Sequence, residues 1–203
     1  FVGNFAEAVN SFSKAIEIEP NNADAYNDRG SSYRQLKQYS AAINDYKKAG
    51  QLAPKHAFVF NNIGTTKRLM KDYEGAQNAY TRALSINPRF YLAYNNRGVM
   101  LAEQGKYQDA IKDYDRCINI NKDFAPAYNN KGAALHKIEK YTDAIKALDK
   151  SISLNPDYAE AYVNRGISKE MARDEEGACK DWAKARELGS QEGKIYQVNN
   201  CSF

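Results

Sequence analysis

The chain has 203 residues, of which 43% are apolar and 27% are charged, a balance typical of a globular protein with a substantial core. Its net charge of +4 comes from 29 basic and 25 acidic side chains that are interleaved along the sequence, so charge gives little reason to expect a nucleic-acid partner or an anionic membrane. The longest apolar runs are only a few residues, which excludes membrane insertion.

A period of 34 residues runs through the sequence, and agreement across independent columns indicates internal repeats. The glycine column contains Gly30, Gly64, Gly98, Gly132 and Gly166. The same step separates the aromatic residues Tyr26, Phe60, Tyr94, Tyr128 and Tyr162, and the alanines Ala42, Ala76, Ala110, Ala144 and Ala178.

The first predicted element is half a unit, residues 1–22, with one amphipathic helix that carries Phe5 and Phe12 and ends before Pro20. Five whole units follow, and each has apolar and small residues at three- and four-residue steps in two stretches. This pattern predicts a helix A and then a helix B in every unit. The predicted units are residues 23–56, 57–90, 91–124, 125–158 and 159–192.

The last predicted element, residues 193–203, begins in the phase of a helix A and has no helix B after it. Two interpretations stay open. The segment is a capping helix, which repeat arrays need at their ends, or it completes the half unit at the start of a second copy and builds a head-to-tail filament. The residues expected at such self-assembly ends are Phe1, Phe5, Phe12, Tyr196 and Phe203. Because the chain starts without Met, we also expect a processed or truncated N-terminus.

Two columns predict how helices A and B pack. A helical glycine costs about 1 kcal/mol relative to alanine, so five at one column indicate a close approach between the helices. The seventh residue of a unit is Arg wherever the twenty-third is Asp, and we expect these two side chains to pair across the helices, setting register more than adding stability. The pairs are Arg29 with Asp45, Arg97 with Asp113, and Arg165 with Asp181.

Counted from Ala23, the first whole unit has Tyr26 fourth, Gly30 eighth, Ala42 twentieth and Pro54 thirty-second. This pattern closely resembles the tetratricopeptide repeat family, and the resemblance covers almost the whole chain. It implies an all-α fold, a right-handed α-solenoid of antiparallel helix pairs, with A helices along the concave face. The departures are scattered: Lys67, Cys117, Leu148, Ser151 and Lys169.

No catalytic or metal-binding arrangement is evident. Neither His56 nor His136 has a nucleophile or a second metal ligand at a motif spacing, and the glycines stand singly instead of forming a phosphate loop. We therefore expect no enzyme activity and no cofactor. Cys117 replaces a packing alanine, and Cys179 and Cys201 suggest no disulfide framework, so redox state and compartment stay open.

The family resemblance implies a binding groove along the A helices. Asparagine carries both a donor and an acceptor, so a column of asparagines can hold the backbone of an extended peptide, as in the similar repeats of O-GlcNAc transferase. A purely structural role, bonding neighbouring helices, is the alternative. The groove residues predicted at the sixth position are Asn62, Asn96, Asn130 and Asn164, and those at the fifth are Asn27, Asn61, Asn95 and Asn129.

Phe58, Leu92, Arg34 and Arg68 are predicted to flank these asparagines, which favours a moderately apolar peptide. The carboxylate clamp that some family members use for chaperone tails is excluded, because the fifth position is never Lys. The tyrosines fall in packing columns and not on a stacking surface for bases. The sequence therefore predicts a non-catalytic scaffold for a protein or peptide partner, with the head-to-tail filament as the alternative.

Overall fold

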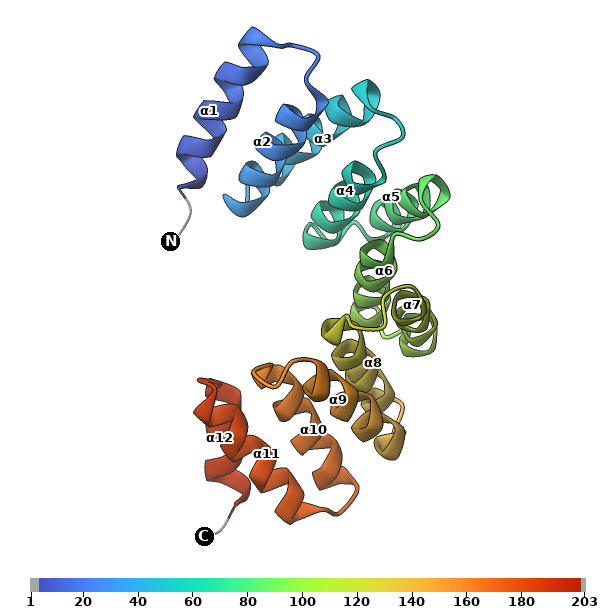
Figure 1. The fold of residues 1–203 in the computed structure, drawn as a ribbon, viewed down its shortest axis with the longest axis vertical. Coiled ribbons are helices and arrows are strands. Elements are labelled where there is room, and N and C mark those ends of the chain that lie inside the picture. Colours follow the sequence, from blue (N-terminus) through green and yellow to red (C-terminus); the bar gives the residue numbers. More distant parts are fainter. Residues whose placement is uncertain (1–3, 202–203) are drawn as a thin grey trace. The chain divides into compact units, whose positions relative to one another are not determined.

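Residues 4–201 are described by the computed structural model, and they form twelve α-helices and no strand (Figure 1). The chain divides into two compact units, Phe1–Met100 and Leu101–Phe203. Within each unit, helices that follow one another in sequence pack against each other. The predicted all-α solenoid of antiparallel helix pairs is confirmed. Among the described residues, no helix is long and apolar enough to cross a membrane.

The first unit contains five complete helices and most of a sixth. Its helices are α1 (Phe5–Ile18), α2 (Ala23–Gln35), α3 (Tyr39–Leu52), α4 (Ala57–Leu69), α5 (Tyr73–Ile86) and α6 (Tyr91–Glu103), the last of which continues past Met100. The second unit contains α7 (Tyr107–Ile120), α8 (Ala125–Lys137), α9 (Tyr141–Leu154), α10 (Ala159–Met171), α11 (Glu175–Glu187) and α12 (Gln191–Asn200).

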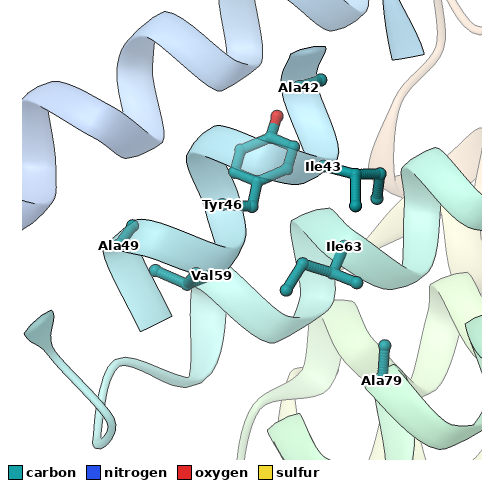
Figure 2. Close-up of a cluster of buried hydrophobic side chains, with 7 residues drawn as sticks. All are labelled: Ala42, Ile43, Tyr46, Ala49, Val59, Ile63 and Ala79. Carbon is teal, nitrogen blue, oxygen red and sulfur yellow. The ribbon is translucent and has the colours of Figure 1, made fainter. Parts of the chain in front are cut away.

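The core of the first unit forms where a B helix meets the next A helix (Figure 2). Tyr46 of α3 is fully buried, and α4 contributes Val59 and Ile63 to the same cluster. Small residues make this packing possible: a Cβ added at Gly64 of α4 would lie 2.7 Å from the ring of Tyr80 in α5. The glycine column therefore exists because the aromatic side chain of the partner helix occupies that space.

A left-handed residue ends most A helices and starts the turn into helix B. In the turn between α2 and α3, Lys37 has φ 59°, and the next amide, of Gln38, donates to the carbonyl of Tyr33. This arrangement satisfies helix-end carbonyls that would otherwise lack donors. The corresponding positive-φ residues are Lys71, Gly105, Glu139 and Arg173.

Two of the predicted Arg–Asp pairs are present within the units. Arg29 makes two hydrogen bonds to Asp45, of 2.7 and 2.8 Å, and Arg165 binds Asp181 in the same way. Burial alone would lower the pKa of Arg165, but hydrogen bonds and the negative charge of Asp181 outweigh it, and the pKa is raised. The pair of Arg97 and Asp113 joins residues of different units and stays a prediction.

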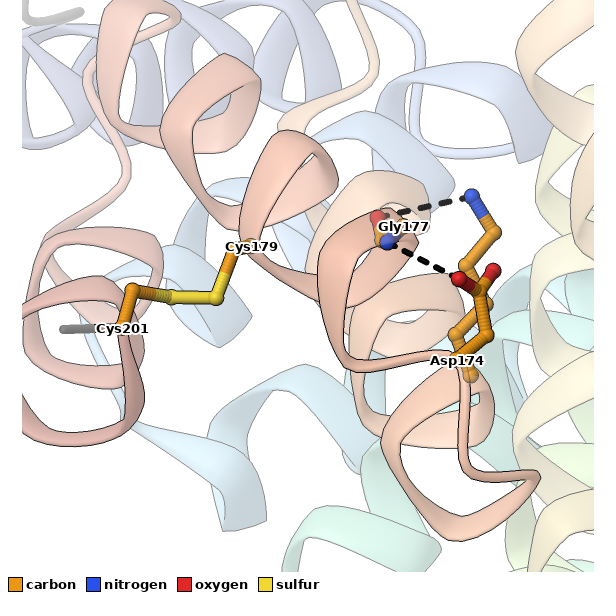
Figure 3. Close-up of a disulfide and its surroundings, with 5 residues drawn as sticks. Asp174, Gly177, Cys179 and Cys201 are labelled. Atoms are coloured by element: carbon orange, nitrogen blue, oxygen red, sulfur yellow. Dashed lines mark hydrogen bonds between the residues drawn. A yellow bond between two sulfur atoms is a disulfide. The ribbon is translucent and has the colours of Figure 1, made fainter. Parts of the chain in front are cut away.

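The C-terminal end is closed by a covalent bond that the sequence analysis missed. Cys179 of α11 forms a disulfide with Cys201, which follows α12 (Figure 3). Tyr196 stacks on Trp182 of α11, with ring centroids 5.2 Å apart. Ser190 caps α12, so the helix begins at Gln191, two residues before the predicted start. Residues 1 and 203, where Phe1 and Phe203 were expected to form self-assembly contacts, lie outside the described residues.

The remaining predicted end residues belong to packed helices. Phe5 and Phe12 of α1 are half-buried, and α1 packs against α2. The remaining cysteine, Cys117, is buried and forms no disulfide, in agreement with its position in a packing column.

Candidate functional site

The fifth-position asparagines are buried. Asn129 is fully buried, and Asn27, Asn61 and Asn95 are each at most 8% exposed. A side chain this deeply buried offers almost no surface to a ligand. These four residues therefore contribute to the site by what they hold in place.

What they hold is the sixth-position asparagine of the next repeat. In the first unit the side-chain amide of Asn62 donates to Asn27 Oδ1 at 2.9 Å, and that of Asn96 donates to Asn61 Oδ1 at 3.0 Å. Each bond joins consecutive A helices. Within this unit the two asparagine columns thus form a hydrogen-bonded row.

The second unit contains the same contact. Asn164 of α10 donates to Asn129 Oδ1 of α8 at 2.9 Å, and Asn129 in turn donates to Glu160 Oε1 at 3.1 Å and to the Tyr158 hydroxyl at 3.3 Å. The side-chain nitrogen and the side-chain oxygen of Asn129 both hydrogen-bond within the protein. Burial, followed by the charge of Glu160, raises the pKa of Tyr158 to about 12.

Three sixth-position asparagines, Asn62, Asn96 and Asn164, keep part of their hydrogen-bonding capacity. An amide group has two N–H donors and one carbonyl acceptor, and each contact to the preceding repeat uses a single donor. Among the described residues, nothing hydrogen-bonds to the Oδ1 atoms of Asn62, Asn96 and Asn164. These half-buried side chains retain one donor and one acceptor, the pair that one residue of an extended peptide backbone requires. Asn130, also half-buried, lies at the same position of α8.

The row begins differently in the first whole repeat. Asp28 occupies the sixth position of α2, is exposed, and accepts a hydrogen bond of 3.0 Å from Asn27. The carboxylate offers acceptors only. The first position of the row therefore favours a donor on the ligand.

The predicted flanking side chains are accessible to different degrees. Phe58 at the start of α4 is 38% exposed, and Leu92, Arg34 and Arg68 are half-buried. Phe58 lines a depression of about 280 Å³ together with His56 and Phe90, where the loops that precede α4 and α6 meet. Phe58 stands one helical turn before Asn62 on α4, so the depression begins on the side of α4 that carries Asn62.

His136 of α8 makes a second contact between consecutive A helices of the second unit. Its Nδ1 atom lies 3.3 Å from the hydroxyl of Ser168 in α10. That hydroxyl has one proton, which it donates to the backbone carbonyl of Asn164 at 2.9 Å. The Nδ1 atom of His136 therefore carries the hydrogen and donates to Ser168. Burial and then the positive charge of Lys137 lower the pKa of His136, which favours the neutral ring.

The second histidine is placed differently, and neither histidine gathers metal ligands. His56 Nδ1 lies 3.8 Å from an exposed carboxylate oxygen of Asp24. Within residues 4–201, no group of three His, Cys, Asp or Glu side chains has a geometry that could hold a metal ion.

Sequence reasoning missed the residues that complete the asparagine contacts. Tyr158 and Glu160, which bind Asn129, were not predicted, although both stand at the start of α10, where the family pattern places the neighbouring helix against α8. The disulfide likewise joins Cys179 of α11 to the residue that follows α12, and the repeat pattern places these two helices next to each other.

Comparison with known proteins identifies the family. Models described as tetratricopeptide repeat match residues 21–89, 91–124 and 125–158, and a model described as TPR repeat matches residues 3–36. The chain belongs to the tetratricopeptide repeat family. No curated protein sequence matches it.

Solved structures show the same fold at low identity. One chain of the APC/C hetero-tetramer Cut9–Hcn1 is 17% identical with a TM-score of 0.84, and the match covers 98% of this tetratricopeptide protein but 40% of that chain. PilF of Pseudomonas aeruginosa is 22% identical with a TM-score of 0.80, covering 97% and 90% of the two chains. YrrB, described as a TPR protein with an unusual peptide-binding site, is 19% identical with a TM-score of 0.68, covering 92% and 97%.

Proposed function

We propose that this tetratricopeptide protein is a non-catalytic scaffold that binds an extended peptide segment of a partner protein along its A helices. The observation that carries the proposal is the oriented asparagine row. The amides of Asn62, Asn96 and Asn164 are each held by a buried asparagine of the preceding repeat and keep a donor and an acceptor for a ligand. Because these side chains are already ordered, little conformational entropy is lost on binding.

The surroundings of the row support a peptide of mixed character. The row offers hydrogen bonds to any backbone, whereas Phe58 and the depression beside it favour an apolar side chain. Backbone contacts with side-chain pockets between them are a recurring mode of peptide recognition. The fold neighbour YrrB is described as having a peptide-binding site, which adds general support.

A peptide selected from a random library on the full chain tests the proposal. We expect Asn62→Ala and Asn164→Ala each to weaken its binding about tenfold, since losing one or two hydrogen bonds of about 1 kcal/mol each approaches the 1.4 kcal/mol of a tenfold change. Fluorescence anisotropy of the labelled peptide measures the affinity.

Asn78→Ala is the matched control, because Asn78 is an exposed asparagine on the B helix α5. Circular dichroism establishes that each variant is folded. Selected peptides that bind the two row variants as tightly as the control variant would refute the proposal.

A second candidate function is head-to-tail assembly through the two ends. The observation that favours it is the apolar surface of α12, where Ile195 is 57% exposed and Val198 is 69% exposed. Light scattering over a concentration series tests it. A molecular mass that grows with concentration supports assembly, provided that Val198→Lys abolishes this growth. A constant monomer mass rejects it.

A further inference from the structure

The basic residue at the seventh position of a repeat reaches between two B helices. In the last whole repeat, Arg165 of α10 binds Asp181 of α11, and its third nitrogen donates to Asp149 of the preceding α9 at 2.7 Å. The guanidinium therefore has two carboxylate partners, one on each side. Arg29 of α2 repeats this geometry, with Asp45 of α3 on one side and Ser13 of α1 on the other.

The repeat formed by α8 and α9 lacks one of these partners. Lys131 takes the place of the arginine, and Ala147 of α9 stands where every repeat with an arginine has aspartate. Lys131 binds the remaining partner, Asp115 of α7, with its Nζ atom 2.6 Å from the carboxylate oxygen. The side that would face Asp at position 147 has only a methyl group.

A cavity occupies the vacated space. It has a volume of about 380 Å³ and lies between α7, α8 and α9, within the range of about 300–1,000 Å³ that is usual for ligand pockets. Its floor is apolar and belongs to a packed cluster of Leu135, Ala147 and Ile111. In the first unit, by contrast, the seventh position is Ile63, which packs against Ala79 in the core.

The rim of the cavity is predominantly basic. Lys146 and Lys150 of α9 line it together with Lys131, against the two carboxylates of Asp115 and Asp143. Asp143 lies 3.9 Å from Lys146, and both side chains are well exposed. Among the described residues, no carboxylate is within ion-pair distance of Lys150. The pocket therefore has unmatched positive charge above an apolar floor.

The cavity is separate from the asparagine row. Tyr128, Lys131 and Leu135 follow a spacing of three and four residues and lie along one side of α8. Asn130 and Ala133, by the same helical geometry, lie along the opposite side. A ligand in the cavity would not compete with a peptide on the row.

We propose that this cavity is a second binding site, which takes an acidic side chain and an adjacent apolar side chain from a partner peptide. The carboxylate replaces the aspartate that position 147 lacks and pairs with Lys131, with Lys150 at the rim. The apolar side chain covers Leu135 and Ile111. Charge complementarity selects the acidic residue, and the apolar floor selects its neighbour.

Titration of the isotope-labelled full chain with the probe acetyl-Leu-Glu-Leu-amide, followed by amide NMR shifts, tests the proposal. We expect saturable shifts confined to α7, α8 and α9, and at least tenfold weaker binding of the matched probe acetyl-Leu-Gln-Leu-amide. Ala147→Asp supplies the missing carboxylate from within the chain and is expected to weaken binding of the glutamate probe at least tenfold.

Further variants keep the outcome clear if Ala147→Asp folds poorly. Lys150→Gln, at an exposed position, should weaken binding at least threefold, whereas Lys184→Gln on α11 should leave it unchanged. Asn164→Ala should also leave it unchanged, which distinguishes this site from the asparagine row. Any of three results would overturn the proposal: equal affinity for the two probes, amide NMR shifts outside α7, α8 and α9, or unchanged affinity of the Lys150→Gln variant for the glutamate probe.

Discussion

At the scale of single residues, the paired asparagines show how one residue type serves two roles. A fifth-position asparagine such as Asn129 is buried and saturated with hydrogen bonds, whereas a sixth-position asparagine such as Asn164 is half-buried and only partly used. Burying an amide without partners costs free energy, so each buried asparagine needs its neighbour. The row is therefore a structural element, and its role as a recognition surface is the function that we propose for it.

The lowered pKa of His136 predicts a specific pH dependence of stability. Because the folded pKa lies below the unfolded value of about 6.5, the unfolded chain binds more protons as the pH falls through that value, and stability decreases. We expect His136→Gln to reduce the loss of stability between pH 7.5 and pH 5.5, measured by urea unfolding. Identical pH dependence in both proteins would contradict this prediction.

The carboxylate of Asp181 predicts a large effect on stability. Its side chain is 5% exposed and binds Arg165 and, at 2.9 Å, Lys169. Asp181→Ala leaves two cations in a largely buried site, and we expect a loss of about 3 kcal/mol in the free energy of unfolding. Asp149→Ala is the control: Asp149 is 52% exposed and also binds Arg165, and its loss should cost less than about 1 kcal/mol. Equal losses would show that burial does not govern this network.

At the scale of helices, most turns between helices A and B contain a residue in an unfavourable backbone conformation. Left-handed backbone is unfavourable for residues with a side chain, by about 1–2 kcal/mol, yet Lys37, Lys71, Glu139 and Arg173 adopt it. Gly105 at the equivalent turn avoids the cost. The hydrogen bonds that end each A helix hold the other four residues in place.

Replacing one of these residues by glycine should stabilise the protein. For Glu139→Gly, relief of the left-handed backbone exceeds the extra entropy of glycine in the unfolded chain, and we expect a gain of up to about 1 kcal/mol. The thermal midpoint should rise by about 2–4 °C. Glu139→Ala keeps a side chain in the same conformation and is the control; a glycine variant no more stable than this alanine variant would argue against the prediction.

At the scale of the whole molecule, repeats contact mainly their neighbours, so stability is distributed along the chain. An end helix has a neighbour on one side only. The disulfide of Cys179 and Cys201, with 22 residues of sequence separation, fastens α12 to α11. The stacked rings of Trp182 and Tyr196 add to the same contact.

Loss of the disulfide should loosen the C-terminal end alone. A cross-link closing a loop of this size contributes about 3 kcal/mol, so we expect amide protons of α12 to exchange much faster in the double variant Cys179→Ser with Cys201→Ser. Helices α2 to α5 of the first unit provide an internal control and should be unaffected. Unchanged exchange in α12 would show that ring stacking and helix packing suffice.

The sequence by itself determined the helices and their family. The 34-residue period, the glycine and aromatic columns and the first helix over residues 5–18 were all readable, because helix periodicity is local and each repeat restates it. The pairs of Arg29 with Asp45 and of Arg165 with Asp181 were readable for a related reason: two columns that change together indicate contact. What the sequence also specified was that asparagines recur beside the expected groove.

Only the tertiary structure decided what those asparagines do. The contact between Asn62 and Asn27 joins residues 35 positions apart, and the disulfide and the cavity beside Lys131 likewise depend on which helix packs next to which. The two columns of asparagines differ in burial, although the residue type is the same: the fifth-position side chains are buried and the sixth-position side chains are half-buried. A side chain's role is set by the neighbours that share its space, and those neighbours come from other repeats.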